Sequence, residues 1–240
     1  MVIVRYRIVL YRLCNLESGF KCEPSHARVF PMKVSDSTDA SARPSPTETR
    51  ILNAARELFF SEGFSAVSTE KLSKKAGVSK SSIYKYFSSM KGVLVAGGCQ
   101  EGDILKVGVT MTPETKEDFW RSLIAYGTKL LTLLNQRHCI QFDQMLHEEA
   151  RKYPDLSRSF YEVTYHRSHL EITQLIKAGK ARGFITKPYR SEELADNLIC
   201  MWESLAYTRA RLSLIDKPFR NPKKWARQCV DALFENALSK

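Results

Sequence analysis

The sequence STEKLSKKAGVSKSSIYKYF, from Ser68 to Phe87, predicts two short helices joined by a tight turn. Leu72 and Ala76 lie four residues apart, which makes one side of the first helix apolar. The hydroxyl of Ser68 can accept a hydrogen bond from a free N–H group of the first turn, so we expect this serine to cap the helix. Gly77 should end it, because glycine adopts positive φ angles at no steric cost.

The second helix of this stretch follows directly after the turn. We expect Val78 to be the buried residue of the turn and Ser79 to cap the helix. Ile83 and Phe87, again four residues apart, form its inner face. The remaining side chains face outward and are basic, hydroxylic or aromatic: Lys80, Ser81, Ser82, Tyr84, Lys85 and Tyr86.

This order of elements is typical of a helix-turn-helix, whose second helix lies in the major groove of DNA. Hydroxyl and free N–H groups at the start of that helix suit a phosphate, and the tyrosines and Lys85 can reach phosphates or base edges. The competing interpretation is a plain helical hairpin with a solvated, lysine-rich face. The succession of small residue, glycine, apolar turn residue and cap favours DNA binding.

A longer helix is predicted just before this unit, from Pro46 to about Glu62. We expect it to pack on the other two helices and to complete a three-helix unit. Thr49 lies in its first turn, where a phosphate can bind. The apolar residues that recur at helical spacing are Ile51, Ala55, Leu58 and Phe59.

The segment from Thr49 to Leu94 resembles the N-terminal domain of the TetR (tetracycline-repressor) family of bacterial regulators. Two positions depart from the family pattern. Ser82 stands where a threonine is common, and Met90 stands where a lysine often binds phosphate, with Lys91 as its substitute one residue later. The matching residues are Thr49-Arg50, Ile51-Leu52, Ala55, Leu58-Phe59, Gly63-Phe64, Leu72, Ala76 to Ser79, Tyr84, Tyr86-Phe87 and Leu94.

The resemblance implies a dimer that binds a palindromic operator and responds to a small molecule. Repression is the commoner outcome in such families, and activation remains the alternative, as does nonspecific DNA binding. By chemistry and by resemblance, the candidate DNA contacts are Thr49, Ser68, Ser79, Lys80, Ser81, Ser82, Tyr84, Lys85, Tyr86 and Lys91.

Charge and composition agree with this interpretation. The 240-residue chain is 43% hydrophobic and 26% charged, as expected of a globular protein, and its net charge of +11 permits a polyanionic partner. Residues 47–94 carry 8 Lys or Arg and 4 Asp or Glu, whereas the longer segment 95–240 carries 22 and 18. The basic excess is therefore densest around the helix-turn-helix. The six cysteines form no C-x-x-C pair, which suits reduced thiols in a bacterial cytoplasm.

We predict an all-α fold in three parts: an irregular or disordered extension (1–46), the helix-turn-helix domain (47–94) and a larger helical domain (95–240) that binds ligand and dimerises. Two interpretations of residues 1–31 stay open, a short strand or sequence upstream of a translation start at Met32. Residues 35–46 are rich in Ser, Thr, Asp, Ala and Pro and predict a flexible arm, in which Arg43 can reach a minor groove or remain solvated.

A connecting helix is predicted from Lys91 to about Thr110. Four glycines weaken it, each by about 1 kcal/mol relative to alanine. They indicate either a hinge between the two domains or close packing against neighbouring helices, and the resemblance favours the hinge. The glycines are Gly92, Gly97, Gly98 and Gly102.

The C-terminal sequence predicts helices throughout, and we expect Asp155 and Ser191 to cap two of them. The pattern around Glu149-Ala150, Tyr153-Pro154 and Gly183 resembles the AefR-like branch of TetR C-terminal domains. That resemblance implies a homodimer in which residues 191–214 and 222–238 pair with their copies, with burial inside the same subunit as the alternative. The predicted helices span 114–135, 137–151, 155–181, 191–214 and 222–238.

Aromatic residues of this domain and one methionine are candidates for a small, largely apolar ligand site, although such residues more often fill a core. His166 and His169 lie three residues apart, but no third metal ligand is evident and we expect no metal and no cofactor. No catalytic or nucleotide-binding motif occurs, so we expect a regulator and not an enzyme. The candidate pocket residues are Trp120, Tyr126, Phe142, Met145, Tyr161, Tyr165, Trp202 and Tyr207.

Overall fold

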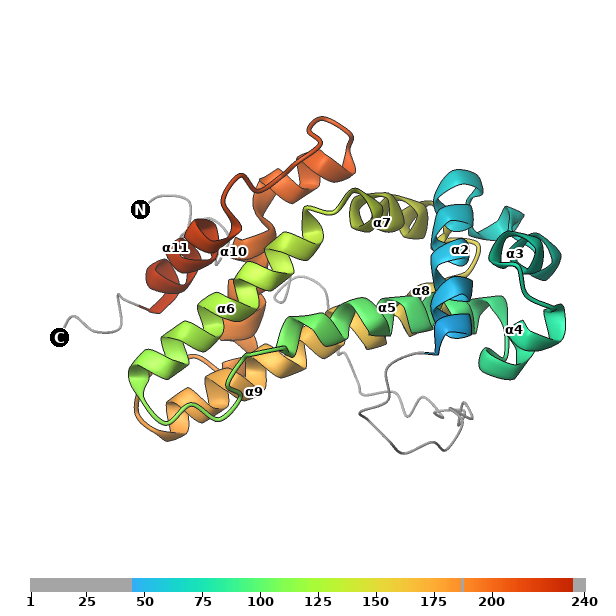
Figure 1. Ribbon diagram of the computed structural model, residues 1–240. Helices are drawn as coiled ribbons and strands as arrows, with labels where there is room; N and C mark the ends of the chain where they lie inside the picture. The colour runs from blue at the N-terminus through green and yellow to red at the C-terminus, as the bar shows by residue number, and fades with distance from the viewer. Residues whose placement is uncertain (1–44, 187, 235–240) are drawn as a thin grey trace, which may run out of the picture. The chain divides into compact units, whose positions relative to one another are not determined.

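The computed structural model describes residues 45–186 and 188–234, and every regular element in these ranges is helical (Figure 1). The all-α prediction is therefore confirmed for the described chain. The elements are α2 (Pro46–Glu62), η1 (Phe64–Ala66), α3 (Thr69–Ala76), α4 (Lys80–Tyr86), α5 (Met90–Lys106), α6 (Lys116–Leu134), α7 (Arg137–Glu149), α8 (Pro154–Tyr161), η2 (Glu162–His166), α9 (Arg167–Ala181), α10 (Ser191–Arg211) and α11 (Pro222–Phe234).

Helices α2, α3 and α4 form the predicted three-helix unit. The Ser68 hydroxyl accepts a hydrogen bond from the amide of Lys71 (3.2 Å), and Ser79 accepts one from Ser82 (3.1 Å), so both predicted caps are confirmed. Gly77 adopts the left-handed conformation (φ 62°, ψ 39°) that ends α3. The buried apolar residues of the unit include Ile51, Leu52, Ala55, Phe59, Leu72, Ala76, Ile83 and Phe87.

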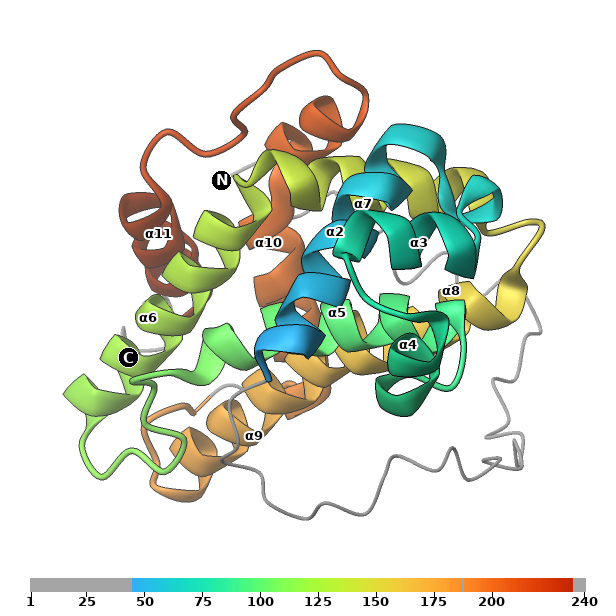
Figure 2. The same cartoon turned by 45° about the vertical axis from the view of Figure 1, so that its right-hand side comes forward.

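Helix α5 leaves this unit and enters the C-terminal part of the chain (Figure 2). The amide of Gly92 donates to the hydroxyl of Ser89 (3.1 Å), which caps the start of the helix. The helix ends at Lys106, before the predicted end at Thr110, because Gly108 has a φ of 69° and breaks the helical backbone. Gly98 packs closely: a Cβ at that position would lie 2.6 Å from the ring of Phe160. Close packing therefore accounts for this glycine.

The C-terminal core lies between α6, α9, α10 and α11. Helix α11 packs along α6, and α9 packs along α10 (Figure 1). Gly127 on α6 makes room for Trp202, since a Cβ there would lie 2.5 Å from the indole. The core contains Phe119, Leu123, Tyr126, Leu131, Ile172, Leu175, Ile176, Leu194, Leu198, Trp202, Val230 and Phe234.

The long helix predicted from Asp155 to Ala181 is divided in the structure. It begins at Pro154, with Tyr153 at the N-cap, so the prediction that Asp155 caps it is wrong. Proline suits the first helical position because it lacks an N–H group that would need a partner there. A π-helical turn, η2, then separates α8 from α9. Such turns insert one residue and reorient the side chains beside them.

Helix α10 departs from its prediction at both ends and in the middle. Arg190 stands at the N-cap and Ser191 is the first helical residue, so the predicted serine cap is wrong, and the helix ends at Arg211 instead of Leu214. Ser204 interrupts it with a φ of 49°, a value that favours glycine. The amide of Ala206 donates to the Ser204 hydroxyl (3.2 Å), and the indole of Trp225 donates to the Trp202 carbonyl (3.0 Å).

Several predictions fall on residues that the structure does not describe. These are the N-terminal extension with its proposed strand and with Arg43, and the end of the last helix beyond Phe234. Within the part of the chain that the structure describes, no helix combines the length and the apolar composition that a bilayer crossing requires.

Candidate DNA-binding surface and ligand cavity

Helix α4 presents the side chains predicted to contact DNA. Lys80, Ser81, Lys85 and Tyr86 are exposed, and the Tyr84 side chain is 56% exposed. An aromatic side chain with this exposure contributes little to the protein core, so it is accessible for contact with another molecule. Ser82 is half-buried instead, and its hydroxyl lies 2.8 Å from that of Ser79.

Two contacts from α3 orient the exposed side chains of α4. The Tyr84 hydroxyl lies 3.1 Å from the Thr69 hydroxyl, and the Lys80 ammonium lies 3.2 Å from a Glu70 carboxylate oxygen. Thr69 was not predicted to take part in the site. Nothing in the sequence links it to Tyr84, because the two positions meet only when the turn places α4 across α3.

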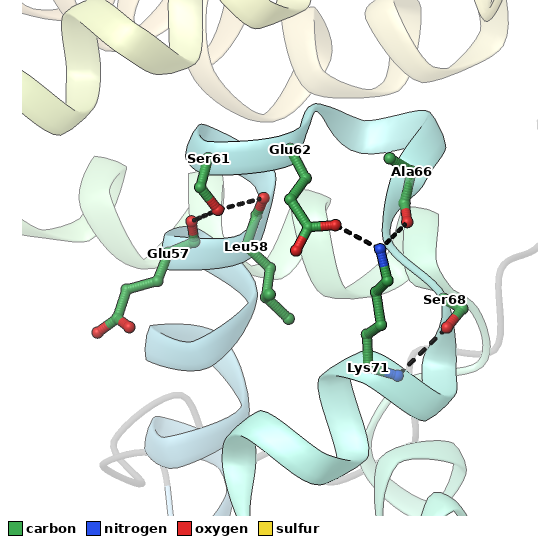
Figure 3. Close-up of polar contacts among 7 residues, drawn as sticks. All are labelled: Glu57, Leu58, Ser61, Glu62, Ala66, Ser68 and Lys71. Atoms are coloured by element: carbon green, nitrogen blue, oxygen red, sulfur yellow. Dashed lines mark hydrogen bonds and ion pairs between the residues drawn. The ribbon is translucent and has the colours of Figure 1, made fainter.

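Lysines of α3 contact the end of α2 and the turn that follows it, and Figure 3 shows the contacts of Lys71. The Lys71 ammonium contacts the Glu62 carboxylate at the end of α2 and donates to the carbonyl of Ala66 (3.2 Å). Lys75 pairs with Glu57 on α2 (2.8 Å). These two ion pairs connect α3 to α2, while Lys74, Lys80 and Lys85 are further exposed basic side chains of the unit.

The remaining predicted contacts lie at helix starts. Thr49 is half-buried in the first turn of α2, and its amide donates to the Ser45 carbonyl (2.9 Å). Lys91 is half-buried in the first turn of α5. Ser68 and Ser79 use their hydroxyls as caps. Contact of any of these residues with DNA stays a prediction.

A cavity of about 180 Å³ lies where the helix-turn-helix unit meets the C-terminal helices. One wall comes from α2 and α5, and the others come from α6, α7, α8, η2, α9 and α10. The lining residues are mostly apolar, with a few polar and charged side chains among them: Leu52, Ala55, Arg56, Phe59, Phe60, Val93, Leu94, Gly97, Gly98, Gly102, Leu105, Leu130, Leu133, Leu134, His138, Cys139, Phe142, Asp143, Phe160, Thr164, Tyr165, Ser168, Ile199, Glu203 and Tyr207.

Aromatic rings form one part of this cavity. The Phe142 and Phe160 ring centroids are 4.6 Å apart, and Phe60 meets Phe142 edge-on at 6.0 Å. His138 stacks on Phe60 at 6.4 Å. Gly97 also lines the cavity, and a Cβ built there would meet no atom within 4 Å.

A buried carboxylate forms the polar part. Asp143 on α7 is 5% exposed, and its two oxygens accept hydrogen bonds from the hydroxyls of Tyr165 and Tyr207 (2.8 Å for Tyr207). Burial, and then the nearby Asp143 charge, raise the pKa of both tyrosines well above its ordinary value. The tyrosines therefore remain protonated donors at neutral pH. The π-helical turn η2 carries Tyr165.

A second buried carboxylate joins α5 to α9 and α6. Glu171 is 7% exposed and accepts a hydrogen bond from the Tyr126 hydroxyl (2.8 Å). Arg167 and Lys106 lie 3.0 and 3.1 Å from its other oxygen. Arg167 also pairs with Asp103 on α5. These ion pairs hold the C-terminal end of α5 against α9.

Of the predicted pocket residues, Phe142, Tyr165 and Tyr207 line the cavity. The others lie elsewhere. Tyr126 and Trp202 are fully buried in the core with stacked rings, and Trp120 packs edge-on against Phe234. Met145 is buried among the residues of the helix-turn-helix core, and Tyr161 is half exposed. Ligand contact by any of them stays a prediction.

The structure also places the histidines that suggested a metal. The His169 ring nitrogen lies 3.2 Å from an Asp196 oxygen, and that of His166 lies 3.9 Å from Glu162. Among the side chains that the structure describes, no group of three or more His, Cys, Asp or Glu is arranged to hold a metal ion.

An all-helical chain with an exposed recognition helix near its start and a cavity behind it belongs to the class of helix-turn-helix transcriptional regulators. Comparisons with known proteins make the family explicit. Residues 51–96 match the model of the bacterial regulatory proteins of the tetR family, and residues 121–235 match that of the AefR-like transcriptional repressor C-terminal domain. This chain belongs to the TetR family, in the branch with an AefR-like C-terminal domain.

Individual relatives agree with this assignment. The HTH-type transcriptional regulator YvkB of Bacillus subtilis (strain 168) is 27% identical over 198 residues, which cover 81% of this chain and 98% of YvkB. A TetR-family regulator from Mesorhizobium loti has a TM-score of 0.62 at 22% identity, covering 82% of this chain and 97% of that one. The flavonoid-responsive regulator FrrA has a TM-score of 0.62 at 22% identity, covering 80% and 95%. At such identities, the two solved structures establish a shared fold.

Proposed function

We propose that this chain is a dimeric repressor that leaves a palindromic operator when a small, largely apolar molecule enters the cavity. The observation that carries the proposal is the shared cavity wall. Helices α2 and α5 both line the cavity, α2 packs on α3 of the helix-turn-helix, and α5 packs on α2, so a molecule placed there would contact the DNA-binding unit itself. Binding that favours one position of this unit shifts the population away from the DNA-bound arrangement.

A second route from the cavity to the DNA-binding unit runs along α7. Phe142 and Asp143 line the cavity, and Glu149 stands in the last turn of the same helix. A Glu149 oxygen accepts a hydrogen bond from Ser65 (2.8 Å) in η1, just before α3. A shift of α7 would therefore be transmitted to the helix-turn-helix without passing through a flexible loop.

Dimerisation through α10 and α11 completes the proposal. The Leu205 side chain on α10 is 61% exposed, and Trp225 on α11 is also exposed. A two-fold axis beside these helices would bury both side chains against their copies. The two α4 helices should then lie about 34 Å apart, which is the separation of adjacent major grooves on one side of DNA.

The chemistry of the effector follows from the cavity lining, which is chiefly aliphatic and aromatic. FrrA, which shares the fold, responds to flavonoids, and we propose an aromatic effector for this chain as well. We further propose a binding role without a catalytic step, carried out in the bacterial cytoplasm where the DNA lies.

Binding of the purified protein to a labelled operator duplex, measured by fluorescence anisotropy, tests the proposal. Tyr84→Ala and Lys85→Ala should each weaken operator binding about tenfold, because each removes a groove or phosphate contact. Lys217→Ala removes an exposed charge in the loop after α10 and should leave the affinity unchanged. Light scattering should report an intact dimer for all three variants. Loss of the dimer with unchanged DNA affinity in Tyr84→Ala or Lys85→Ala would refute the assignment of α4.

A further inference from the structure

The charged groups of the cavity do not balance. Arg56 and Glu203 contribute one charge of each sign, and Asp143 adds a second carboxylate. Among the described residues, the Asp143 carboxylate accepts hydrogen bonds from two neutral phenols, those of Tyr165 and Tyr207. The guanidinium of Arg211 lies over the ring of Tyr207, with its Cζ 5.4 Å from the ring centroid.

A buried carboxylate in this setting has unused acceptor capacity. Each of its oxygens carries two lone pairs, and each accepts a single hydrogen bond, from Tyr165 or from Tyr207. Removing a carboxylate from water is costly unless it is paired or fully hydrogen-bonded. A donor that reaches Asp143 from inside the cavity would therefore gain more than one that binds a neutral surface.

We infer that the effector is a small aromatic molecule whose head group donates a hydrogen bond to Asp143, as a phenol or a protonated amine does. The inference rests on the proposed function for the role of the cavity as an effector site, and it specifies the ligand class. An aromatic acid is disfavoured because its carboxylate would face that of Asp143, although Arg56 lies in the same cavity.

The size and shape of the cavity fit a single substituted ring. A dry engineered cavity of about 150 Å³ binds benzene, and this cavity measures about 180 Å³. The rings of Phe60, Phe142 and Phe160 can pack around such a molecule in offset or edge-on contact. Gly97 leaves the adjacent surface of α5 without a side chain.

Four probes of similar size test the inference on the full-length protein without DNA, by calorimetry and by thermal denaturation. Phenol and benzylamine carry a donor, toluene carries none, and benzoate carries an acceptor of like charge. The two donors should bind at least about tenfold more tightly than toluene, a difference that corresponds to about 1.4 kcal/mol. Benzoate should not bind. Equal binding of phenol and toluene, or tighter binding of benzoate, would overturn the inference.

Variants identify the acceptor. Asp143→Asn should abolish the advantage of phenol and benzylamine over toluene. Tyr165→Phe keeps the carboxylate and removes one of its donors, so it should bind both donor probes more tightly than the wild type. If Asp143→Asn does not fold, Tyr165→Phe still tests the assignment. If phenol no longer binds Tyr165→Phe more tightly than toluene does, the tyrosine hydroxyl is the group that binds phenol, and the assignment to Asp143 is refuted. Gly97→Leu introduces a side chain into the cavity and should weaken all binding probes alike.

These outcomes are separable from those of the proposed function. Donor binding that depends on Asp143 but leaves operator affinity unchanged would support the ligand class and refute effector-controlled release. Release of the operator by a compound outside this class, with no binding of phenol or benzylamine, would support the proposed function and refute the ligand class.

Discussion

Asp143 and Glu171 are both buried carboxylates that accept a hydrogen bond from a tyrosine, yet their surroundings differ. Glu171 has two cations within 3.1 Å, on α5 and on α9, as well as the Tyr126 hydroxyl. Among the described residues, the Asp143 carboxylate accepts hydrogen bonds from the hydroxyls of Tyr165 and Tyr207, and it borders a cavity. The first carboxylate has its charge neutralised within the protein, whereas the second has an incomplete set of partners.

We propose that this difference separates a structural role from a binding role. At Glu171, the ion pairs hold the end of α5 that is distant from the recognition helix. Asp143 borders the cavity, one wall of which α2 and α5 form. Under the proposed function, charge balance distinguishes the ion-paired end of α5 from the effector site, although both contain a buried acid.

The largest effect on stability is expected at Glu171. Glu171→Ala leaves Arg167 and Lys106 without their shared partner and the Tyr126 hydroxyl without its acceptor. We expect a loss of about 3 kcal/mol in the free energy of unfolding, at the lower end for a broken buried pair because Lys106 is 43% exposed. Urea denaturation measures it. The exposed Glu148→Ala serves as the control and should change little, and a loss below 1 kcal/mol for Glu171→Ala would contradict the structural role.

Removing a tyrosine hydroxyl should cost more stability at Asp143 than at Glu171, because Glu171 also has two cationic partners. Tyr207→Phe leaves Asp143 with one donor and should cost about 2 kcal/mol, while Tyr126→Phe leaves Glu171 with two cations and should cost about 1 kcal/mol. Tyr126 and Tyr207 are both almost fully buried, so the degree of burial does not explain the expected difference. The same denaturation experiment ranks them. The reverse order would show that the cations do not compensate at Glu171.

Alkaline pH should weaken the fold through the tyrosines. Burial, and then the Asp143 charge, raise the pKa of Tyr207 above that of an unfolded chain, which lies near 10. Its contribution to stability is therefore complete below pH 10 and is lost as the pH rises toward the folded value, with a slope of at most about 1.4 kcal/mol per pH unit. Denaturation at pH 8 to 11 should give a shallower decline for Tyr207→Phe than for the wild type. Identical slopes would contradict this linkage.

The smallest effect concerns Lys106. Because its side chain is partly exposed and Glu171 keeps Arg167, Lys106→Ala should cost about 0.5 kcal/mol. The cost should shrink in 1 M salt, where the screening length is about 3 Å. Unfolding at low and high salt checks this expectation, and a cost that does not depend on salt would show that packing of the lysine stem, and not its charge, is responsible.

The helix-turn-helix and its caps could be predicted from short stretches of sequence. Ser68, Gly77 and Ser79 act through bonds and backbone angles within a few residues, which a sequence displays directly. The cavity depends on contacts between distant residues. Asp143 meets Tyr165 and Tyr207 across 22 and 64 positions, and neither the π-helical turn nor the Ser204 kink has a local signature. Aromatic type alone could not separate Phe142 at the cavity from Trp202 in the core, since both are apolar residues on helices.

The most direct test of the central claim, that this chain is a sequence-specific operator-binding regulator, is a titration against DNA. The purified protein is titrated with the intergenic duplex upstream of its own gene and with a scrambled duplex, at two salt concentrations. The account predicts a preference for the intergenic duplex that persists at the higher salt. Equal affinity for both duplexes, lost as salt rises, would show phosphate attraction alone and would contradict the claim.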